Sequence, residues 1–447
     1  MVSLKEQISP AQVILVGFAG MILVGTALLM LPISVQGPGG ASFMDALFTA
    51  TSATCVTGLV LYDTATYWTC FGHGVILTLI QIGGLGVVTM GIAVTIFSGK
   101  RIGLKQRLVM QESISAPQMG GIVRITNFIL RSVLLMEGVG ALLLALRFCP
   151  EMGFWKGIWY GIFHSISAFC NAGFDLLGTP DAQFVSLTDY QTDPLVNGVI
   201  MLLIVLGGIG FLTWKDVADH RHHFHAYRLQ SKLVLVVTLA LLVLPTLYFY
   251  FYEFSLTQWN GLGTQERVLG AAFQSVAPRT AGFNTIDLNE LSMPSKMLTV
   301  ILMLIGGSSG STAGGFKTTT LAVFILAVGA AFHRRESLQC FGRRLNPESL
   351  RSAMTITFLY LVLTISSGMV IACVEGVALS AALFETASAI GTVGLSLGLT
   401  SNLSTLSQMI LVFLMYFGRV GGLTLIYAVI NTPPVPAQLP QERITVG

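Results

Sequence analysis

The chain has 447 residues and a net charge of +3, and 53% of its residues are hydrophobic while only 10% are charged. Ordinary soluble domains contain about 25% charged residues. The composition therefore excludes a soluble globular protein. It predicts an integral membrane protein surrounded by lipid, and we expect no nucleic-acid partner.

Apolar runs of about 20 residues, enough to cross a hydrocarbon core of ~30 Å, recur along the whole chain. We predict eight spans, with no soluble domain of useful size between them. The first run is long and lacks a small-residue cleavage site, which distinguishes it from a removable signal peptide. The predicted spans are Ala11–Ile33, Gly74–Phe97, Ile125–Leu146, Leu195–Trp214, Leu233–Tyr252, Met297–Phe332, Met354–Val374 and Gln408–Ile430.

The distribution of charge predicts the orientation of these spans. If the N-terminus is cytoplasmic, sixteen Lys and Arg residues fall on the cytoplasmic face and five on the other, which is the bias typical of membrane proteins. We therefore predict a multi-pass protein of the cytoplasmic membrane with both termini cytoplasmic. The opposite loops collect carboxylates, which would either attract cations to an entrance or simply be solvated. They include Asp63, Asp175, Asp181, Asp189, Asp193, Asp287 and Glu290.

Four segments too short to cross the bilayer resemble one another, and each lies between the two spans of a pair. All four end in glycine followed by an apolar residue, and these glycines are separated by 115, 109 and 112 residues. Such regular spacing indicates an internal fourfold repeat. The segments are FTATSATCVTGL (Phe48 to Leu59), FHSISAFCNAGF (Phe163 to Phe174), FQSVAPRTAGF (Phe273 to Phe283) and FETASAIGTVGL (Phe384 to Leu395).

A second glycine, at Gly83, Gly207, Gly306 and Gly418, recurs in the following span of each unit, 25, 34, 24 and 24 residues further on. Because each unit has an even number of spans, the units are parallel and related by an axis along the membrane normal. We predict an all-α fold of eight transmembrane helices and four re-entrant half-helices around a central pore with pseudo-fourfold symmetry. The predicted repeats are residues 11–98, 123–218, 230–332 and 348–430, followed by a proline-containing cytoplasmic tail at 431–447.

The four glycine loops would meet at the centre, where backbone carbonyl oxygens can replace the hydration shell of a potassium ion. Glycine suits such a loop because it adopts positive φ without steric cost. No repeat carries the full TVGYG run, so we expect fewer ion sites than in a four-subunit potassium channel. The predicted filter residues, with potassium as the bound ion, are Val56, Thr57, Gly58, Asn171, Ala172, Gly173, Thr280, Ala281, Gly282, Thr392, Val393 and Gly394.

In these repeats and their glycines the chain resembles the Trk/Ktr/HKT superfamily of potassium transporters, over roughly Ala11 to Ile430. It is most similar to the Ktr membrane subunit, since the first repeat begins almost at the N-terminus. In this family a serine in place of the first filter glycine accompanies sodium preference, so Gly58 implies potassium. The resemblance also implies a homodimer and a separate cytosolic ring of nucleotide-binding, KtrA-like regulatory subunits.

The stretch GGSSGSTAGGFKTTT, Gly306 to Thr320, has two possible interpretations. A phosphate-binding loop needs the form GxxxxGK[ST] between a strand and a helix, but here Phe316 intrudes before Lys317 and the flanks are apolar. The 36-residue span Met297–Phe332 is ~54 Å long as a helix, more than one crossing requires. We therefore predict two half-helices joined by an irregular loop at residues 306–317 that hangs in the pore.

The family resemblance implies that this loop is a gate, although a kink for close helix packing is the simpler alternative. Arg419 lies at the same level in the last span, and in this family such an arginine lies near the gate loop. A charge inside a span is costly and faces a cavity or a partner. The predicted gate residues are Gly306, Gly307, Ser308, Ser309, Gly310, Ser311, Thr312, Ala313, Gly314, Gly315, Lys317 and Arg419.

The sequence thus predicts a gated, channel-like subunit for potassium uptake. Potassium would be its substrate and sodium a candidate activator, and we expect no cofactor in this chain. A sodium-coupled potassium symporter or a sodium-permeable transporter is the alternative, but the spans contain no ring of carboxylates suited to coupling.

We expect no enzyme activity, since Ser311 with Lys317 is the only candidate pair. His220 to His225 favour a solvated or partner-contacting loop over a metal site, and the six cysteines favour packing.

Overall fold

The computed structural model describes residues 9–86, 121–335 and 337–422, together with residues 89, 108, 109, 111 and 424. This part of the chain is mainly helical, and its one sheet is the antiparallel hairpin of β1 (Gln339–Cys340) and β2 (Arg343–Arg344). The ends of the predicted spans Gly74–Phe97 and Gln408–Ile430, and the tail at 431–447, lie outside the described residues.

Four long helices correspond to the predicted first span of each pair. Within the described residues, these four are long and apolar enough to cross a membrane, and α9 with α10 makes a fifth if that bent pair is one span. Apolar side chains on their surfaces are exposed, for example Leu135 and Phe358 at 68% each, as expected where a helix faces lipid. The helices are α1 (Pro10–Leu29), α7 (Ile122–Met152), α11 (Leu229–Phe251) and α15 (Pro347–Glu375).

A short helix follows each long one and contains the beginning of the repeated segment. These helices are α2 (Phe43–Thr54), α8 (Phe154–Phe169), α12 (Thr264–Val276) and α16 (Leu379–Gly391). The phenylalanine that begins each repeated segment is at most 1% exposed, so it anchors its helix in the core. After each short helix the chain leaves helical geometry and passes through the glycine loop.

The second helix of each pair is shorter than one crossing and ends at a break. These helices are α4 (Cys70–Leu85), α9 (Pro194–Ile209), α13 (Met293–Leu304) and α17 (Thr405–Val420). The predicted continuous span Leu195–Trp214 is in fact interrupted, because Gly210 has φ 100° and α10 (Phe211–His220) leaves α9 at 94°. Glycines with φ near 90° also end α4 at Gly86 and α17 at Gly421. In the third pair, residues 305–317 separate α13 from α14 (Thr318–Phe332).

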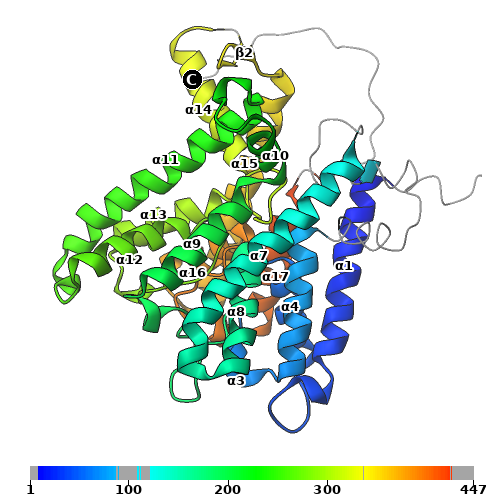
Figure 1. Cartoon of the computed structure of the whole chain (residues 1–447), viewed down its shortest axis with the longest axis vertical. Coiled ribbons are helices and arrows are strands. Elements are labelled where there is room, and N and C mark those ends of the chain that lie inside the picture. Colours follow the sequence, from blue (N-terminus) through cyan, green and yellow to red (C-terminus); the bar gives the residue numbers. More distant parts are fainter. Residues whose placement is uncertain are drawn as a thin grey trace, which may run out of the picture.

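Contacts between the helices close into a ring. Each short helix packs against its own long helix, and it also packs against the second helix of the preceding unit: α4 contacts α8, α9 contacts α12, and α13 contacts α16. The last unit returns to the first through α17 and α2. In Figure 1, α1 and α4 accordingly lie on one side of the molecule and α11, α12 and α13 on the other.

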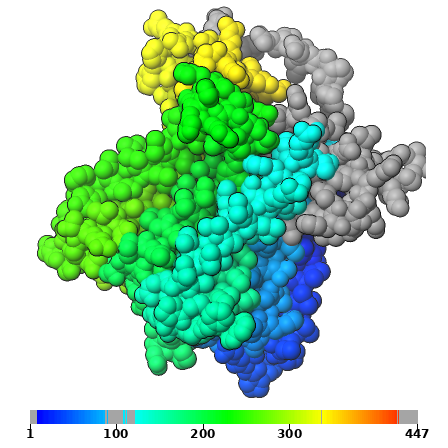
Figure 2. All heavy atoms as spheres, in the orientation of Figure 1, coloured from blue at the N-terminus to red at the C-terminus, as the bar shows by residue number. Residues whose placement is uncertain are grey.

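The two ends of the molecule differ in shape. The short α3 (Thr64–Tyr67) lies at one end, whereas α10, the end of α14 and the β hairpin gather at the other (Figure 1) and form the projection seen in Figure 2. Asp216 of α10 stabilises this projection by accepting hydrogen bonds from the Ser231 hydroxyl at 2.6 Å and the Arg228 N–H at 3.1 Å. Short 3₁₀ turns complete the connections, at Pro32–Ser34, Thr188–Tyr190, Phe224–Ala226, Glu253–Ser255, Thr257–Trp259, Leu288–Glu290 and Thr400–Asn402.

Candidate functional site

The four glycine loops share one unusual backbone conformation. Gly58, Gly173, Gly282 and Gly394 have φ values of 89°, 68°, 80° and 95°. The residue two positions earlier also has positive φ in every loop, at 52°, 57°, 66° and 52° for Val56, Asn171, Thr280 and Thr392. Residues other than glycine adopt this region only when the surroundings hold them there. The repeat in the sequence is therefore a repeat in backbone geometry.

Hydrogen bonds from each loop to its own short helix hold this conformation. Thr57 N–H donates to the Ser52 carbonyl, and Val393 N–H to the Ser388 carbonyl, both at 2.8 Å. The Ser52 hydroxyl accepts a further bond from Gly58 N–H at 3.1 Å. The third repeat, which is one residue shorter, has no serine at this place. There the Ala277 carbonyl accepts from the N–H groups of Ala281 and Gly282, at 3.0 and 3.4 Å.

The loops of neighbouring repeats approach one another so closely that side chains cannot fit between them. A Cβ built on Gly58 would lie 2.5 Å from the Ala172 carbonyl oxygen, and one on Gly173 would lie 2.8 Å from that of Ala281. A Cβ on Gly282 would lie 2.4 Å from the Val393 carbonyl oxygen, and one on Gly394 would lie 2.3 Å from the carbonyl oxygen of Thr57 in the first loop. The four glycines and the carbonyls before them thus form a closed ring.

A cavity of about 230 Å³ lies on one side of this ring, and the four glycines line it. We call it the glycine-loop cavity. Its wall carries three carboxylates, Asp63, Asp175 and Asp287, and several hydroxyl and amide groups. Asp63 also joins two repeats, because it accepts a hydrogen bond from the Phe184 N–H at 3.0 Å. The other outer carboxylates predicted from the sequence do not line this cavity.

The irregular segment between α13 and α14 packs against the ring from the opposite side. A Cβ on Gly314 would lie 2.0 Å from the Thr392 hydroxyl oxygen, so this glycine lies directly against the fourth glycine loop. The Lys317 ammonium group folds back and donates to the carbonyls of Ala313 and Gly314, at 2.8 and 3.1 Å. The residues predicted as a gate loop therefore form one compact structure beside the predicted filter residues.

The same segment is hydrogen-bonded to the break in the second repeat. Ser308 N–H donates to the Gly208 carbonyl at 2.8 Å, and Thr312 N–H donates to the Gly207 carbonyl at 3.2 Å. In return, the Phe211 N–H donates to the Gly310 carbonyl at 2.8 Å. Breaking α9 frees backbone groups that must be satisfied inside the molecule, and the segment at 306–317 satisfies them.

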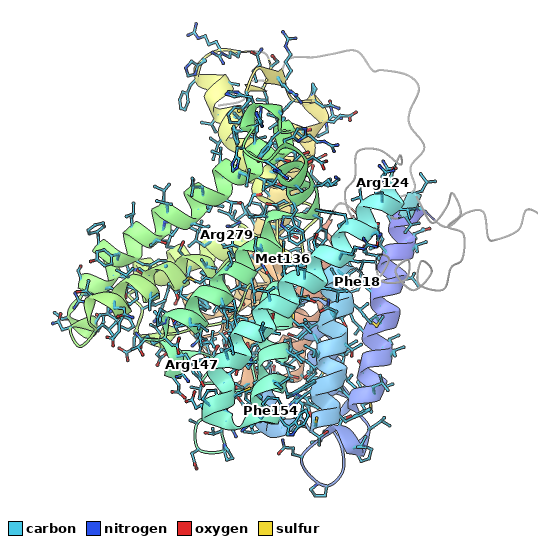
Figure 3. The ribbon with its side chains drawn as sticks, viewed as in Figure 1. Phe18, Arg124, Met136, Arg147, Phe154 and Arg279 are labelled. Carbon is cyan, nitrogen blue, oxygen red and sulfur yellow. The ribbon has the colours of Figure 1, made fainter. Side chains whose placement is uncertain are left out.

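Arg419 of α17 joins this segment to the first repeat. Its guanidinium group donates to the Thr312 carbonyl and to the carbonyls of Gly83 and Gly84, the last at 2.9 Å. It also lies over the ring of Phe18 on α1, which Figure 3 labels. A second cavity, of about 310 Å³, is lined by Lys317, Arg419 and the breaks after α4 and α17. We call it the helix-break cavity.

The second glycine of each repeat allows close packing of helices behind the ring. A Cβ on Gly83, Gly207 or Gly418 would lie 2.0 Å from the carbonyl oxygen at the end of the adjacent short helix, in Thr54, Phe169 and Ile390 respectively. Gly306 differs, because the nearest atom to its Cβ would be the Gly314 carbonyl oxygen, at 2.2 Å. In the third repeat the irregular segment therefore occupies the place of the short-helix end.

A buried polar contact near the ring joins α7 to α4. Glu137 of α7 is 5% exposed, and both its carboxylate oxygens accept from the Gln81 amide at 3.1 Å. The thiol of Cys170, the residue directly before Asn171, lies 3.8 Å from the Gln81 amide oxygen and 3.9 Å from a carboxylate oxygen of Glu137. The residues lie 56 positions apart in the chain, so no local pattern relates Gln81 to Glu137.

The remaining polar residues of note are Arg279, the histidines from His220 to His225 and the cysteines. Arg279, labelled in Figure 3, is 6% exposed, and its Nε has no hydrogen-bond partner among the described residues. No group of three or more His, Cys, Asp or Glu arranged to hold a metal ion occurs in the described part of the chain, which includes His220 to His225. All six cysteines are free.

Comparison with protein families identifies the chain. The model of the TrkH family of cation transport proteins matches residues 26–437. The chain belongs to the TrkH family. The resemblance predicted from the glycine repeats is therefore confirmed, and membership agrees with a membrane protein rich in apolar helices.

Two similar proteins match this chain over nearly their whole length, and a solved structure shares its fold. The potassium/sodium uptake protein NtpJ of Enterococcus hirae is 39% identical, over 99% of this chain and 98% of its own. The Ktr system potassium uptake protein B of Bacillus subtilis is 38% identical, over 98% and 97%. The crystal structure of the potassium transporter TrkH from Vibrio parahaemolyticus has the same fold, with a TM-score of 0.73 and 18% identity over 95% of this chain and 86% of that one.

Proposed function

We propose that the chain takes up potassium ions along a path through the ring of glycine loops. The observation that carries this proposal is the closed ring itself, in which four carbonyl groups and four glycines of positive φ meet. Backbone carbonyls can replace the water around a potassium ion, and the glycine-loop cavity offers three carboxylates above them. The names of the two close relatives, both uptake proteins for potassium, support the same ion.

We further propose that residues 306–317 and Arg419 act as the gate. This segment lies between the ring and the helix-break cavity, and it contains no regular structure that would be lost on moving. Most of its polar contacts are backbone hydrogen bonds, which water can replace, whereas Phe316 at its end packs in the apolar core against Tyr360. Arg419 would keep the segment in place through its bonds to Thr312 and Gly84.

The proposal places both termini in the cytoplasm, on the end that bears α10 and the β hairpin. The excess of basic residues predicted for that face supports this orientation. A separate regulatory subunit is proposed by analogy, because two of the similar proteins are named as parts of a Ktr system. Such a subunit, and a second copy of this chain, would contact the cytoplasmic end.

A sodium-linked function is the second candidate. One relative, 39% identical, is named as a potassium/sodium uptake protein. A symporter would bind both ions at defined sites, whereas a channel-like path needs only the ring. The candidates therefore differ in how sodium acts. Sodium would stimulate potassium uptake by a symporter, whereas it would compete with potassium in a sodium-permeable ring.

The test is potassium uptake in a strain that lacks its own potassium transporters, with Gly58 intact and changed to serine. We expect uptake by the native chain, and a fall of about tenfold in the preference for potassium over sodium in Gly58→Ser, because its Cβ meets the Ala172 carbonyl. Gly198→Ser, at a glycine with open space around it, is the control. Absence of uptake by the native chain would contradict the proposal.

A further inference from the structure

The residue that follows the buried phenylalanine of each repeat is polar and also buried. These residues are Thr49, His164, Gln274 and Glu385, with exposures of 3%, 0%, 2% and 0%. Burying a polar side chain costs free energy unless it is hydrogen-bonded. Their occurrence at one position in all four short helices therefore raises the question of which groups they serve.

His164 holds the backbone beyond the second glycine. Its Nδ1 lies 2.7 Å from the Tyr160 carbonyl oxygen, which requires that Nδ1 carry the proton. Its Nε2 is then the acceptor for the Leu176 N–H, at 3.3 Å. Leu176 is three residues beyond Gly173. Edge contacts with Phe148 and Phe163 fix the plane of the imidazole ring.

Glu385 does the same in the fourth repeat. Its carboxylate accepts from the Leu397 N–H at 2.9 Å, and Leu397 is three residues beyond Gly394. It also accepts from the hydroxyl groups of Ser396, at 2.8 Å, and Thr400, at 2.6 Å. A different side chain in an equivalent place thus binds the equivalent N–H group.

The other two repeats lack this anchor within the described residues. The Gln274 amide instead donates to the Thr299 hydroxyl of α13, at 3.4 Å. Thr49 makes no hydrogen bond to the loop that follows Gly58 among the described contacts. In the ring of glycine loops, the second and fourth repeats are not neighbours, so the two anchors lie on opposite sides of it.

Each anchored N–H adjoins a side chain in the wall of the glycine-loop cavity. Asp175 precedes Leu176, and Ser396 precedes Leu397, and both Asp175 and Ser396 line the cavity. Fixing the N–H groups therefore fixes where a carboxylate and a hydroxyl stand directly beyond the glycines. An entering cation meets these two groups before it reaches the ring.

We propose that His164 and Glu385 are positioning residues that hold the cavity wall at two opposite repeats and thereby set the preference of the entrance between potassium and sodium. This rests on the proposed uptake function. Neither side chain touches the ion. Each acts through a backbone N–H and the neighbouring residue, because rigid placement of the groups around an ion is what distinguishes ions of different size.

The experiment compares potassium uptake, and its inhibition by sodium, for the full chain in a strain without its own potassium uptake systems. His164→Leu and Glu385→Leu remove the acceptor, whereas His164→Gln and Glu385→Gln retain one. Gln274→Leu is the matched control at the same position of the third repeat. The ratio of apparent affinities for the two ions does not depend on how much protein reaches the membrane, so partial loss of folded chain does not obscure it.

We expect the leucine variants to lower the preference for potassium by roughly fivefold, the order of effect of one hydrogen bond. The glutamine variants should retain most of it, and Gln274→Leu should leave it unchanged. An unchanged preference in both leucine variants, or an equal loss in Gln274→Leu, would overturn the inference. If the native chain takes up no potassium, the proposed function fails first, and the two failures are thus distinguishable.

Discussion

At the scale of single residues, Asp175 is the carboxylate of the glycine-loop cavity whose charge should change near neutral pH. It lies in the connection after α8, outside the membrane-spanning helices, and it lines the glycine-loop cavity. Burial raises the pKa of its carboxyl group to about 7, the Leu177 N–H opposes this rise, and Asp63 adds to it. Asp287 lines the same cavity, and His164 lies behind the next residue, Leu176. A carboxyl group with this pKa is largely neutral at pH 6 and charged at pH 8.

We therefore predict that the KM for potassium falls as the external pH rises from 6 to 8, because only the charged form of Asp175 attracts a cation. The change should be about fivefold, corresponding to an attraction of ~1 kcal/mol across water. Asp175→Asn should keep the higher KM at both pH values. Asp181→Asn, an exposed carboxylate of the same connection that does not line the cavity, should behave as the native chain. A pH dependence that persists in Asp175→Asn would assign the effect to another group.

At the scale of elements, the feature with the most consequences is the segment between α13 and α14. It is held by backbone bonds to Gly207 and Gly208 and by the guanidinium group of Arg419. If it closes the path, loosening it should raise cation flux. Deleting Ser308 to Thr312 removes the residues that make these bonds, and Arg419→Ala removes the bond from α17.

We expect both changes to raise potassium flux by about tenfold or more, and the combination to be far from additive, since the two act on one contact. Uptake rates of the single and combined variants provide the measurement. Lys215→Ala, in the salt bridge with Asp219 on α10, controls for loss of a basic residue elsewhere. Folded variants with native or reduced flux would argue that the segment only packs helices.

Part of this organisation could be predicted from the sequence, and particular residues explain why. The spacing of Gly58, Gly173, Gly282 and Gly394 indicated four equivalent loops. Glycine adopts positive φ without steric cost, and any Cβ at these positions would meet the carbonyl of the next loop. A break within the span Met297–Phe332 followed from its length, which is too great for one crossing, and from the glycines in its middle; the structure places it at residues 305–317. By contrast, the break at Gly210 was not predicted, since apolar residues continue on both sides of it.

Contacts between repeats could not be predicted in the same way. Thr312 bonds to Phe169, which lies 143 residues earlier, and nothing near either residue signals this. His164 and Glu385 share a task but not a side-chain type, so comparing the repeats by residue identity does not relate them. Their roles emerge only when the acceptor is seen beside the N–H three residues beyond the glycine.

At the scale of the whole molecule, the distribution of basic residues predicts the orientation in the membrane. Arg124 and Arg147 mark opposite ends of α7 in Figure 3, and a helix of 31 residues is ~46 Å long. The end with α10 and the hairpin carries Arg221, Arg343 and Arg344. The excess of basic residues at this end is the feature from which a cytoplasmic position follows.

Labelling with a membrane-impermeant maleimide tests this orientation. In a chain whose native cysteines are replaced, Arg344→Cys should react only after the cells are permeabilised, whereas Asp181→Cys should react in intact cells. Both positions are exposed, so reactivity reports the side of the membrane and not burial. Labelling of Arg344→Cys in intact cells would show that the orientation is the opposite of the predicted one, and that the glycine-loop cavity faces the cytoplasm.

The bonds that join residues 306–317 to the second repeat imply that this segment cannot move alone. Were it to withdraw, the Gly207 and Gly208 carbonyls and the Phe211 amide would lose their partners, at a cost that an apolar interior does not permit. Only incoming solvent can replace those partners. If this segment is the proposed gate, its displacement and the entry of water behind it should occur as one event, because an open but dry path would leave those three groups without partners.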